Sequence, residues 1–185
     1  TFLSRSPARP AGVQKVAEQS TGQQPVFALD QQRVTEYVKA GELEQVLRNV
    51  VLSAFQDLVL PYFKHDLHWV SPPSILKYRS GGKYDAHSDN EYWDEKSRRW
   101  VRSMDRDFSL LLYLNNDFDG GGLYFSNFGL RLRPEPGMLV AFPSDHRFQH
   151  AAEPLISGER YVIVSWAAAK GIPKLNSFPA QAILP

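Results

Sequence analysis

The chain has 185 residues, of which 43% are hydrophobic, so it is long and apolar enough to form one domain with a sizeable core. The formal net charge of +1 does not favour nucleic acid or an anionic membrane as a partner, and the lack of cysteine excludes disulfides, thiolate zinc sites and cysteine nucleophiles. No apolar run approaches the ~20 residues that span a bilayer and no signal-peptide core is found, so we expect a cytoplasmic location, while the start at Thr1 instead of methionine suggests a truncated N-terminus.

The first part of the chain is expected to support the domain core. Residues 1–24 are polar and weakly patterned, which predicts a loose N-terminal arm, and residues 25–72 form a helical support region. Within that region "GELEQVLRNVVLSAFQDLVL" has the apolar spacing of one amphipathic helix that ends at Pro61. The predicted apolar stripe consists of Leu43, Val46, Leu47, Val50, Val51, Ala54, Phe55 and Leu58.

Residues 73–185 have the sequence pattern of a β-rich core. Short alternating or apolar segments are separated by Gly and Pro turns, which predicts a sandwich or barrel of strands. The predicted strands are "SILKYRS", "RDFSLLLYLN", "GGGLYFSN", "FGLRLRP", "PGMLVAF" and "RYVIVSWAAA". The fold class expected from these elements is mainly β, or α+β, in a single domain.

One stretch within this region does not fit a strand. Residues 90–107, "NEYWDEKSRRWVRSMDRD", are rich in charges of both signs and lie between two strand signals. We interpret them as a long loop that is either a solvated surface segment or a lid over a site. As a lid it would offer Tyr92, Trp93 and Trp100 to a substrate, and an arginine among residues 98–102 could bind a substrate carboxylate.

A histidine and an aspartate stand two positions apart in "YDAHSDN", at His87 and Asp89. On a strand, side chains two apart face the same side and could reach one metal ion. A third ligand must then come from another strand. His146 and His150 would be ~13 Å apart on a strand, too far to share one ion, so only one of them is a plausible third ligand.

Arg160 begins the apolar segment "RYVIVSW", ten residues after His150, and this spacing favours His150 as the third ligand. A basic side chain that faces a core is costly unless it is paired. Its partner is either an acidic residue of the protein or the carboxylate of a ligand, which a guanidinium binds with two parallel hydrogen bonds.

Taken in order, "YDAHSD", "SLLLYLN", "GGGLYF" and "PEPGMLVAFPSDHRFQHAAEPLISGERYVIVSW" resemble the Fe(II)- and 2-oxoglutarate-dependent dioxygenases, specifically the prolyl 4-hydroxylase-like branch. The likeness covers about residues 75–170. It implies a double-stranded β-helix, also called a jelly roll, with supporting N-terminal helices. It also implies that His87, Asp89 and His150 bind Fe(II).

The same resemblance implies a pocket for 2-oxoglutarate. Arg160 and Tyr113 match the residues that hold its distal carboxylate, and Tyr78 matches a tyrosine that lines the pocket. Trp166 matches an aromatic residue near the iron in some relatives. Ser109 and Leu111 share a strand face with Tyr113 and are also expected to line the pocket. For the aromatic residues, a role in the core is the alternative.

The reaction implied is hydroxylation of a prolyl residue in a peptide or protein at ring carbon 4, with release of succinate and CO2. The cofactors implied are Fe(II), 2-oxoglutarate and dioxygen, with ascorbate as a reductant. One alternative substrate is a free amino acid or another small molecule. Two alternative classes are a metal-binding jelly-roll protein without turnover and a metal hydrolase of similar shape.

Overall fold

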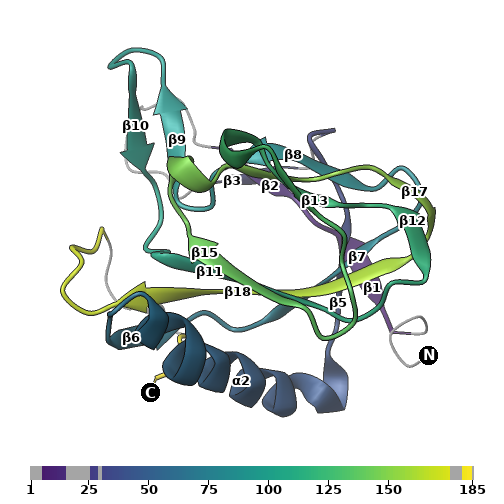
Figure 1. Ribbon diagram of the computed structural model, residues 1–185, viewed down its shortest axis with the longest axis horizontal. Coiled ribbons are helices and arrows are strands. Elements are labelled where there is room, and N and C mark those ends of the chain that lie inside the picture. Colours follow the sequence, from purple (N-terminus) through teal and green to yellow (C-terminus); the bar gives the residue numbers. More distant parts are fainter. Residues whose placement is uncertain (1–5, 16–25, 29–30, 176–180, 185) are drawn as a thin grey trace.

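The computed structural model describes residues 6–15, 26–28, 31–175 and 181–184. These residues form two facing antiparallel sheets, with a helical segment on the outer face of the larger sheet (Figure 1). This arrangement confirms the predicted mainly β jelly roll with helical support. None of the helices in the described residues is both long and apolar enough to cross a membrane.

The larger sheet has the strand order β1-β5-β7-β18-β11-β15, and β6 also pairs with β18. β18 is the longest strand and lies in its middle, where a continuous apolar sequence is expected because both faces are covered. The strands of this sheet are β1 (Ala8–Pro10), β5 (Glu36–Val38), β6 (Leu67–Val70), β7 (Ser74–Tyr78), β11 (Phe108–Tyr113), β15 (Leu139–Pro143) and β18 (Arg160–Ala169).

The smaller sheet has the order β14-β13-β16-β8-β4. Its strands are β4 (Arg33–Val34), β8 (Lys83–His87), β13 (Leu123–Phe125), β14 (Leu130–Leu132) and β16 (His150–Ala152). Three further pairs complete the described strands: β2 (Val13–Lys15) with β3 (Val26–Ala28), β9 (Glu91–Asp94) with β10 (Arg99–Arg102), and β12 (Phe118–Gly120) with β17 (Leu155–Gly158).

Strands begin well before residue 73, where the sequence predicts the start of the β core. β1 lies in the predicted loose arm, and β4 and β5 lie in the predicted helical region, yet β5 joins the larger sheet and β4 the smaller one. These strands are two or three residues long, so they show no alternation that a sequence pattern could detect. Backbone hydrogen bonds hold them in the sheets: β5 pairs with β7, β4 pairs with β8, and β1 pairs with β5. Residues 1–5 and 16–24 of the predicted arm lie outside the described residues.

The predicted helix is present, but its buried face differs from the predicted stripe. The helical segment comprises η1 (Gly41–Leu43), α2 (Glu44–Ser53), the π-helical turn η2 (Ala54–Val59) and α3 (Leu60–Tyr62). Val51 and Phe55 are buried as predicted, whereas Val46 and Leu58 are 55% and 61% exposed. The wider π turn rotates the following residues, so that Val59 packs on the sheet in place of Leu58.

Alternation along β11 and β18 divides the interior into two cores. On β18, Tyr161 and Ile163 pack toward the helix, whereas Val162 and Val164 pack between the two sheets. Because successive side chains of a strand point to opposite faces, Arg160 lies on the same side as Val162. The space between the sheets therefore receives polar as well as apolar side chains.

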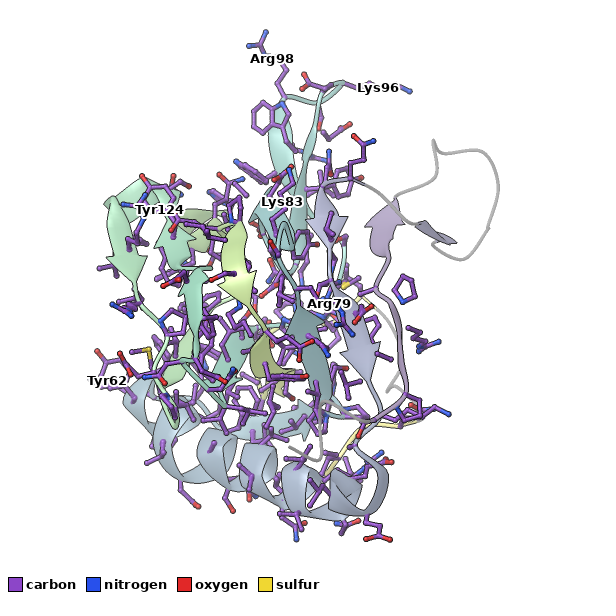
Figure 2. The ribbon with its side chains drawn as sticks, turned by 90° about the vertical axis from the view of Figure 1, so that its right-hand side faces the viewer. Tyr62, Arg79, Lys83, Lys96, Arg98 and Tyr124 are labelled. Atoms are coloured by element: carbon purple, nitrogen blue, oxygen red, sulfur yellow. The ribbon has the colours of Figure 1, made fainter. Side chains whose placement is uncertain are left out.

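The stretch 90–107 is not the predicted loop. It forms the hairpin β9–β10, which projects from the body of the domain with Lys96 and Arg98 near its tip (Figure 2). Trp93 stands opposite Trp100 in the register, and their rings make an edge contact at 5.8 Å. Cross-strand aromatic pairs stabilise a hairpin, and this pairing is hidden in a sequence dominated by charges.

Candidate active site

A cavity of about 370 Å³ lies between the two sheets. Side chains from β7, β8, β11, β16 and β18 line it, as does the start of the hairpin β9–β10. Its polar lining includes three arginines, at positions 33, 106 and 160, and the three residues that the sequence predicts as metal ligands. The cavity therefore combines an apolar wall with a few convergent charged groups, as small-molecule sites commonly do.

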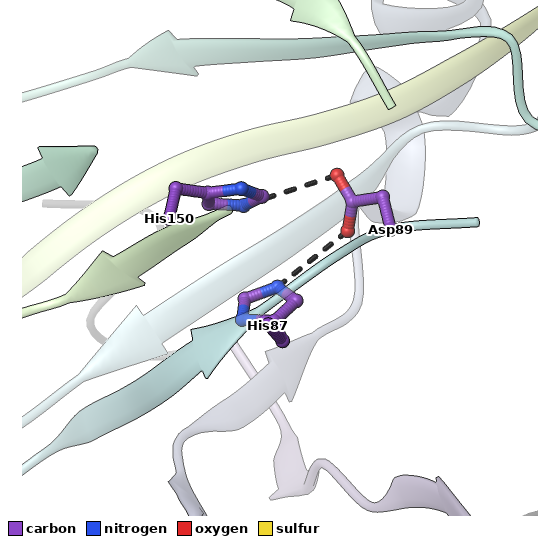
Figure 3. A group of neighbouring side chains, drawn as sticks. All are labelled: His87, Asp89 and His150. Atoms are coloured by element: carbon purple, nitrogen blue, oxygen red, sulfur yellow. Dashed lines mark ion pairs between the residues drawn. The ribbon is translucent and has the colours of Figure 1, made fainter. Parts of the chain in front are cut away.

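The structure brings His87, Asp89 and His150 together (Figure 3). His87 on β8 stands opposite His150 on β16, and Asp89 follows the end of β8. Nε2 of His87 lies 3.5 Å from Oδ1 of Asp89, and Nε2 of His150 lies 3.8 Å from Oδ2. One ligand atom from each residue falls within 4.8 Å of the others, so the three could hold a metal ion on one face.

Both imidazole rings are oriented by backbone carbonyls. Nδ1 of His87 lies 2.9 Å from the carbonyl oxygen of Asp85, and Nδ1 of His150 lies 3.1 Å from that of Phe148. A carbonyl oxygen only accepts, so each Nδ1 must donate its proton. This leaves the lone pair of each Nε2 available to a metal, as in many metal sites whose histidines are held by an outer hydrogen bond.

The protonation states also suit metal binding. Burial and the neighbouring His87 lower the pKa of His150 to about 4, so the ring is neutral near pH 7. Burial raises the pKa of the Asp89 carboxyl, but His150, His87 and Arg106 lower it by more, so it stays well below its usual range. A neutral imidazole and a charged carboxylate are the forms that bind metals.

Ser109 holds the Asp89 carboxylate in place. The Ser109 hydroxyl donates to Oδ2 of Asp89 at 2.6 Å and lies 2.7 Å from the hydroxyl of Ser144. Ser109 is buried on β11 and faces the cavity, as the two-residue period predicts. Tyr84 adds a second support, because its ring stacks on His87 at 3.6 Å.

Arg160 is buried in the cavity wall at the start of β18, with 1% of its surface exposed. Its guanidinium lies 4.0 Å over the ring of Tyr78, and Nη1 donates to the carbonyl of Gly121. A side chain at Gly121 would meet both Arg160 and Leu155, and its φ of +62° also favours glycine. Nε of Arg160 has no partner, and no acidic side chain in the described part of the chain pairs with it.

Tyr113 completes this end of the cavity. Burial raises the pKa of the Tyr113 hydroxyl more than the charge of Arg160 lowers it. The hydroxyl is therefore a neutral donor at physiological pH. Among the described residues, Arg160 is thus a buried cation beside two tyrosines and without an acidic partner, a setting that can bind the carboxylate of a ligand.

Most of the other predicted residues also reach the cavity. Leu111, Trp166, Tyr92 and Trp100 line it, whereas Trp93 is 41% exposed and does not.

His146 does not line the cavity. Its Nδ1 is 2.7 Å from Oε2 of Glu91 and its ring stacks on Trp100, so it fixes the hairpin β9–β10 to the domain.

Two arginines of the cavity are absent from the sequence prediction. Arg106 lies 3.7 Å over the ring of Trp166, and its Nη1 is 3.4 Å from the carbonyl of Asp89. Burial, together with the charge of Arg33, lowers the pKa of Arg106 by more than the charge of Asp89 raises it, so the pKa lies below its usual value. Arg33 lies 4.8 Å over the ring of Tyr84. No motif or periodic spacing in the sequence marks Arg33 or Arg106, because contacts between distant segments bring both into the site.

Comparisons with known proteins agree with this geometry. A model of the family described as the 2OG-Fe(II) oxygenase superfamily matches residues 73–168. Prolyl 3-hydroxylase 1 of Mus musculus is 36% identical over 132 residues, which are 65% of this chain and 18% of that protein. This chain thus corresponds to less than a fifth of that relative's length.

Two solved structures show the same fold. A viral collagen prolyl hydroxylase of Paramecium Bursaria Chlorella virus-1, in its 2OG complex, matches with a TM-score of 0.58 and 19% identity over 74% of this chain and 78% of that one. A prolyl-4-hydroxylase of Pseudomonas putida matches with a TM-score of 0.55 and 23% identity over 75% and 74% of the two chains.

Proposed function

This chain belongs to the 2OG-Fe(II) oxygenase superfamily, and from this premise we propose that it hydroxylates a prolyl residue in a peptide or protein. Family membership implies Fe(II), 2-oxoglutarate and dioxygen as the reacting partners. The observation that carries the proposal is one cavity that contains both a His-Asp-His cluster and Arg160, a buried arginine with no acidic partner in the part of the chain that the structure describes. Ascorbate is proposed as a reductant.

In this proposal His87, Asp89 and His150 hold Fe(II), and Arg160 with Tyr113 and Tyr78 binds the far carboxylate of 2-oxoglutarate. Fe(II), when bound with 2-oxoglutarate and dioxygen, supplies the oxidising chemistry that releases succinate and CO2. The chain's own contribution is orientation. Two backbone carbonyls and Ser109 fix the ligand atoms, and the apolar wall of the cavity limits the access of water.

A prolyl substrate is supported by the names of the relatives and by the mouth of the cavity. Tyr92 and Trp100 line the cavity from the hairpin that directly follows Asp89. Aromatic rings suit the apolar ring of proline. The alternatives are a free amino acid or another small molecule as substrate, a metal-binding protein without turnover, and a metal hydrolase.

The test is succinate release from 2-oxoglutarate with a panel of proline-containing peptides and free amino acids, with the mass of each candidate substrate followed in parallel. The proposal expects succinate formation that requires Fe(II) and dioxygen and is matched by a gain of one oxygen on a peptide. Turnover of free proline but of no peptide favours the small-molecule alternative. Activity with zinc or manganese but without 2-oxoglutarate favours a hydrolase.

The ring position is a separate question. We propose carbon 4, which the sequence resemblance implies. Carbon 3 is the second candidate, because the sequence relative described above is named a prolyl 3-hydroxylase. Acid hydrolysis of the product and chromatography against the two hydroxyproline standards decides between them.

Ser109→Ala should weaken Fe(II) binding by about tenfold to a hundredfold, because it removes the donor that positions the Asp89 carboxylate. Ser165→Ala is a matched control, since Ser165 is equally buried in the same sheet but bonds to Ser71. Both variants lose a buried hydroxyl, so both should lose some stability. Titration of the apoprotein with Fe(II) under nitrogen measures the difference, and equal affinities in the two variants would contradict this role for Ser109.

Trp100→Ala should lower kcat/KM for a peptide substrate by about thirtyfold, a typical effect of truncating a tryptophan that anchors a ligand. Trp93→Ala is the control, because the two rings contact each other and only Trp100 lines the cavity. Binding of 2-oxoglutarate should be unchanged in both. If Trp93→Ala impairs peptide turnover as strongly as Trp100→Ala, the hairpin acts through its own stability and not through substrate contact.

A further inference from the structure

Two further arginines, Arg33 and Arg106, line the cavity of the metal cluster. Arg106 makes one long hydrogen bond, to the carbonyl of Asp89 at 3.4 Å, and otherwise stacks on Trp166. Arg33 donates to the carbonyl of Gly12 at 3.2 Å, and its Nε is buried without a partner. Among the described residues, no carboxylate forms an ion pair with either guanidinium.

The acidic groups of the cavity are already engaged. Of the residues that the structure describes, Asp89 and Glu91 are the acidic side chains that line it, and Glu91 is bonded to His146. If the function proposed above is correct, Fe(II) and Arg160 together balance Asp89 and the two carboxylates of 2-oxoglutarate. Among the described residues, Arg33 and Arg106 would then remain as two partly buried positive charges without an ion-pair partner, an arrangement that an anion in the cavity would stabilise.

These two arginines lie apart from the Arg160 end of the cavity. Arg106 stacks on Trp166, which is six residues along β18 from Arg160. At the rise of a strand, the backbones of Trp166 and Arg160 are about 20 Å apart. Arg33 lies over Tyr84, whose ring stacks on His87. The two guanidiniums therefore lie on the Asp89 and His87 sides of the His-Asp-His cluster.

The arginines that the sequence offered for a substrate carboxylate do not reach this place. Arg98 is near the tip of the hairpin (Figure 2). Arg99 is exposed. Arg102 is bound to Asp107 at 2.8 Å. Arg33 and Arg106 are thus the cavity arginines left to bind an anion.

We propose that Arg106 and Arg33 form a second carboxylate subsite, and that the substrate presents a carboxylate to it beside the carbon that is hydroxylated. This inference rests on the proposed dioxygenase function and specifies its substrate. The carboxylate can come from an acidic side chain next to the proline, or from the C-terminus of a peptide that ends in proline. Both sources offer the planar group that a guanidinium binds with paired hydrogen bonds.

The test measures binding to the protein loaded with Mn(II) and 2-oxoglutarate without dioxygen, so that no turnover is needed. The probes are short acetylated peptides in matched pairs. One pair has Asp or Asn before the proline, a second has Asp or Asn after it, and a third ends in proline with a free carboxylate or a carboxamide. In the parent protein at least one acid should bind about tenfold to a hundredfold more tightly than its amide.

Arg106→Gln should abolish this preference, Arg106→Lys should retain part of it, and Arg33→Gln should reduce it. Arg48→Gln is the control, because Arg48 pairs with Glu44 on α2 outside the cavity, and it should keep the full preference. The pair that responds identifies the source of the carboxylate. Equal binding of acid and amide in all three pairs, or no binding of any acid, overturns the proposal.

The failure of this subsite is distinguishable from failure of the proposed function. Succinate formation by the parent protein, dependent on 2-oxoglutarate and dioxygen, reports the function, and it is measured apart from the preference for acids over amides. Active protein with no preference for acids overturns the subsite alone. Absent succinate formation with every substrate overturns the function, whatever the binding results are.

Discussion

Replacing His87, Asp89 or His150 by alanine should abolish Fe(II) binding at micromolar metal and, with it, hydroxylation. Each residue supplies one of three ligand atoms that lie within 4.8 Å of one another. Two remaining protein ligands cannot define the open, three-coordinate face that this chemistry requires. The folded state should survive, because the two apolar clusters of the domain do not depend on these polar side chains, although His150→Ala also removes ring contacts to Phe125 and Phe142 and should lose some stability.

His146→Ala is the matched control for this experiment. His146 is four residues from His150, but it is bonded to Glu91 and stacked on Trp100. This variant should bind Fe(II) like the parent protein, even if its hairpin is less firmly held. Circular dichroism verifies the fold, and anaerobic calorimetry measures metal affinity. Loss of metal in His146→Ala together with retention in His150→Ala would contradict the proposed ligand set.

Arg160→Ala should raise the KM for 2-oxoglutarate by about thirtyfold to a few thousandfold. The buried guanidinium has no acidic partner among the described residues, so its removal would leave the ligand carboxylate buried and unpaired, which costs about 2–5 kcal/mol. Arg160→Lys should be partly active, since lysine keeps the charge and loses the bidentate fork.

The control for Arg160 is Arg147→Ala. Arg147 lies three residues before His150 in the sequence, but its side chain is 68% exposed and pairs with Asp145 at 2.6 Å. Its KM for 2-oxoglutarate should match that of the parent. Steady-state succinate release at varied 2-oxoglutarate measures both variants. A parent-like KM in Arg160→Ala would show that the distal carboxylate is bound elsewhere.

The strands of the core were predictable because they carry a local signal. "RYVIVSWAAA" and "RDFSLLLYLN" are apolar runs bounded by turn residues, and they form β18 and β11. Alternation along β11 also correctly placed Ser109 and Leu111 in the cavity with Tyr113. This prediction works because successive side chains of a strand always point to opposite faces of the sheet, whatever the rest of the fold is.

Features that depend on contacts between distant segments could not be predicted. The hairpin β9–β10 rests on a tryptophan pair within a charged sequence, and β1 and β5 are held at a sheet edge by backbone hydrogen bonds. The π turn η2 shifted the buried face of the helix away from Leu58. None of these leaves a periodic trace in the sequence.

The residues of the cavity also include some that a sequence pattern reveals and some that only the fold reveals. His87, Asp89, His150 and Arg160 stand in an ordered pattern that resembles a known family, and the fold brings the first three together. Arg33 and Arg106 have no pattern of their own. They enter the cavity because β4 pairs with β8 and because Trp166 supports Arg106.

In the proposed function, this cavity couples the decarboxylation of 2-oxoglutarate to hydroxylation of a prolyl peptide. Isotope-labelled dioxygen tests it most directly, with a peptide from the panel, Fe(II), 2-oxoglutarate and the purified protein. The account predicts one labelled oxygen in the hydroxyproline of the product and the other in succinate, in equal amounts. Oxygen in the product that derives from water, or succinate formed without any labelled peptide across the whole panel, would contradict it.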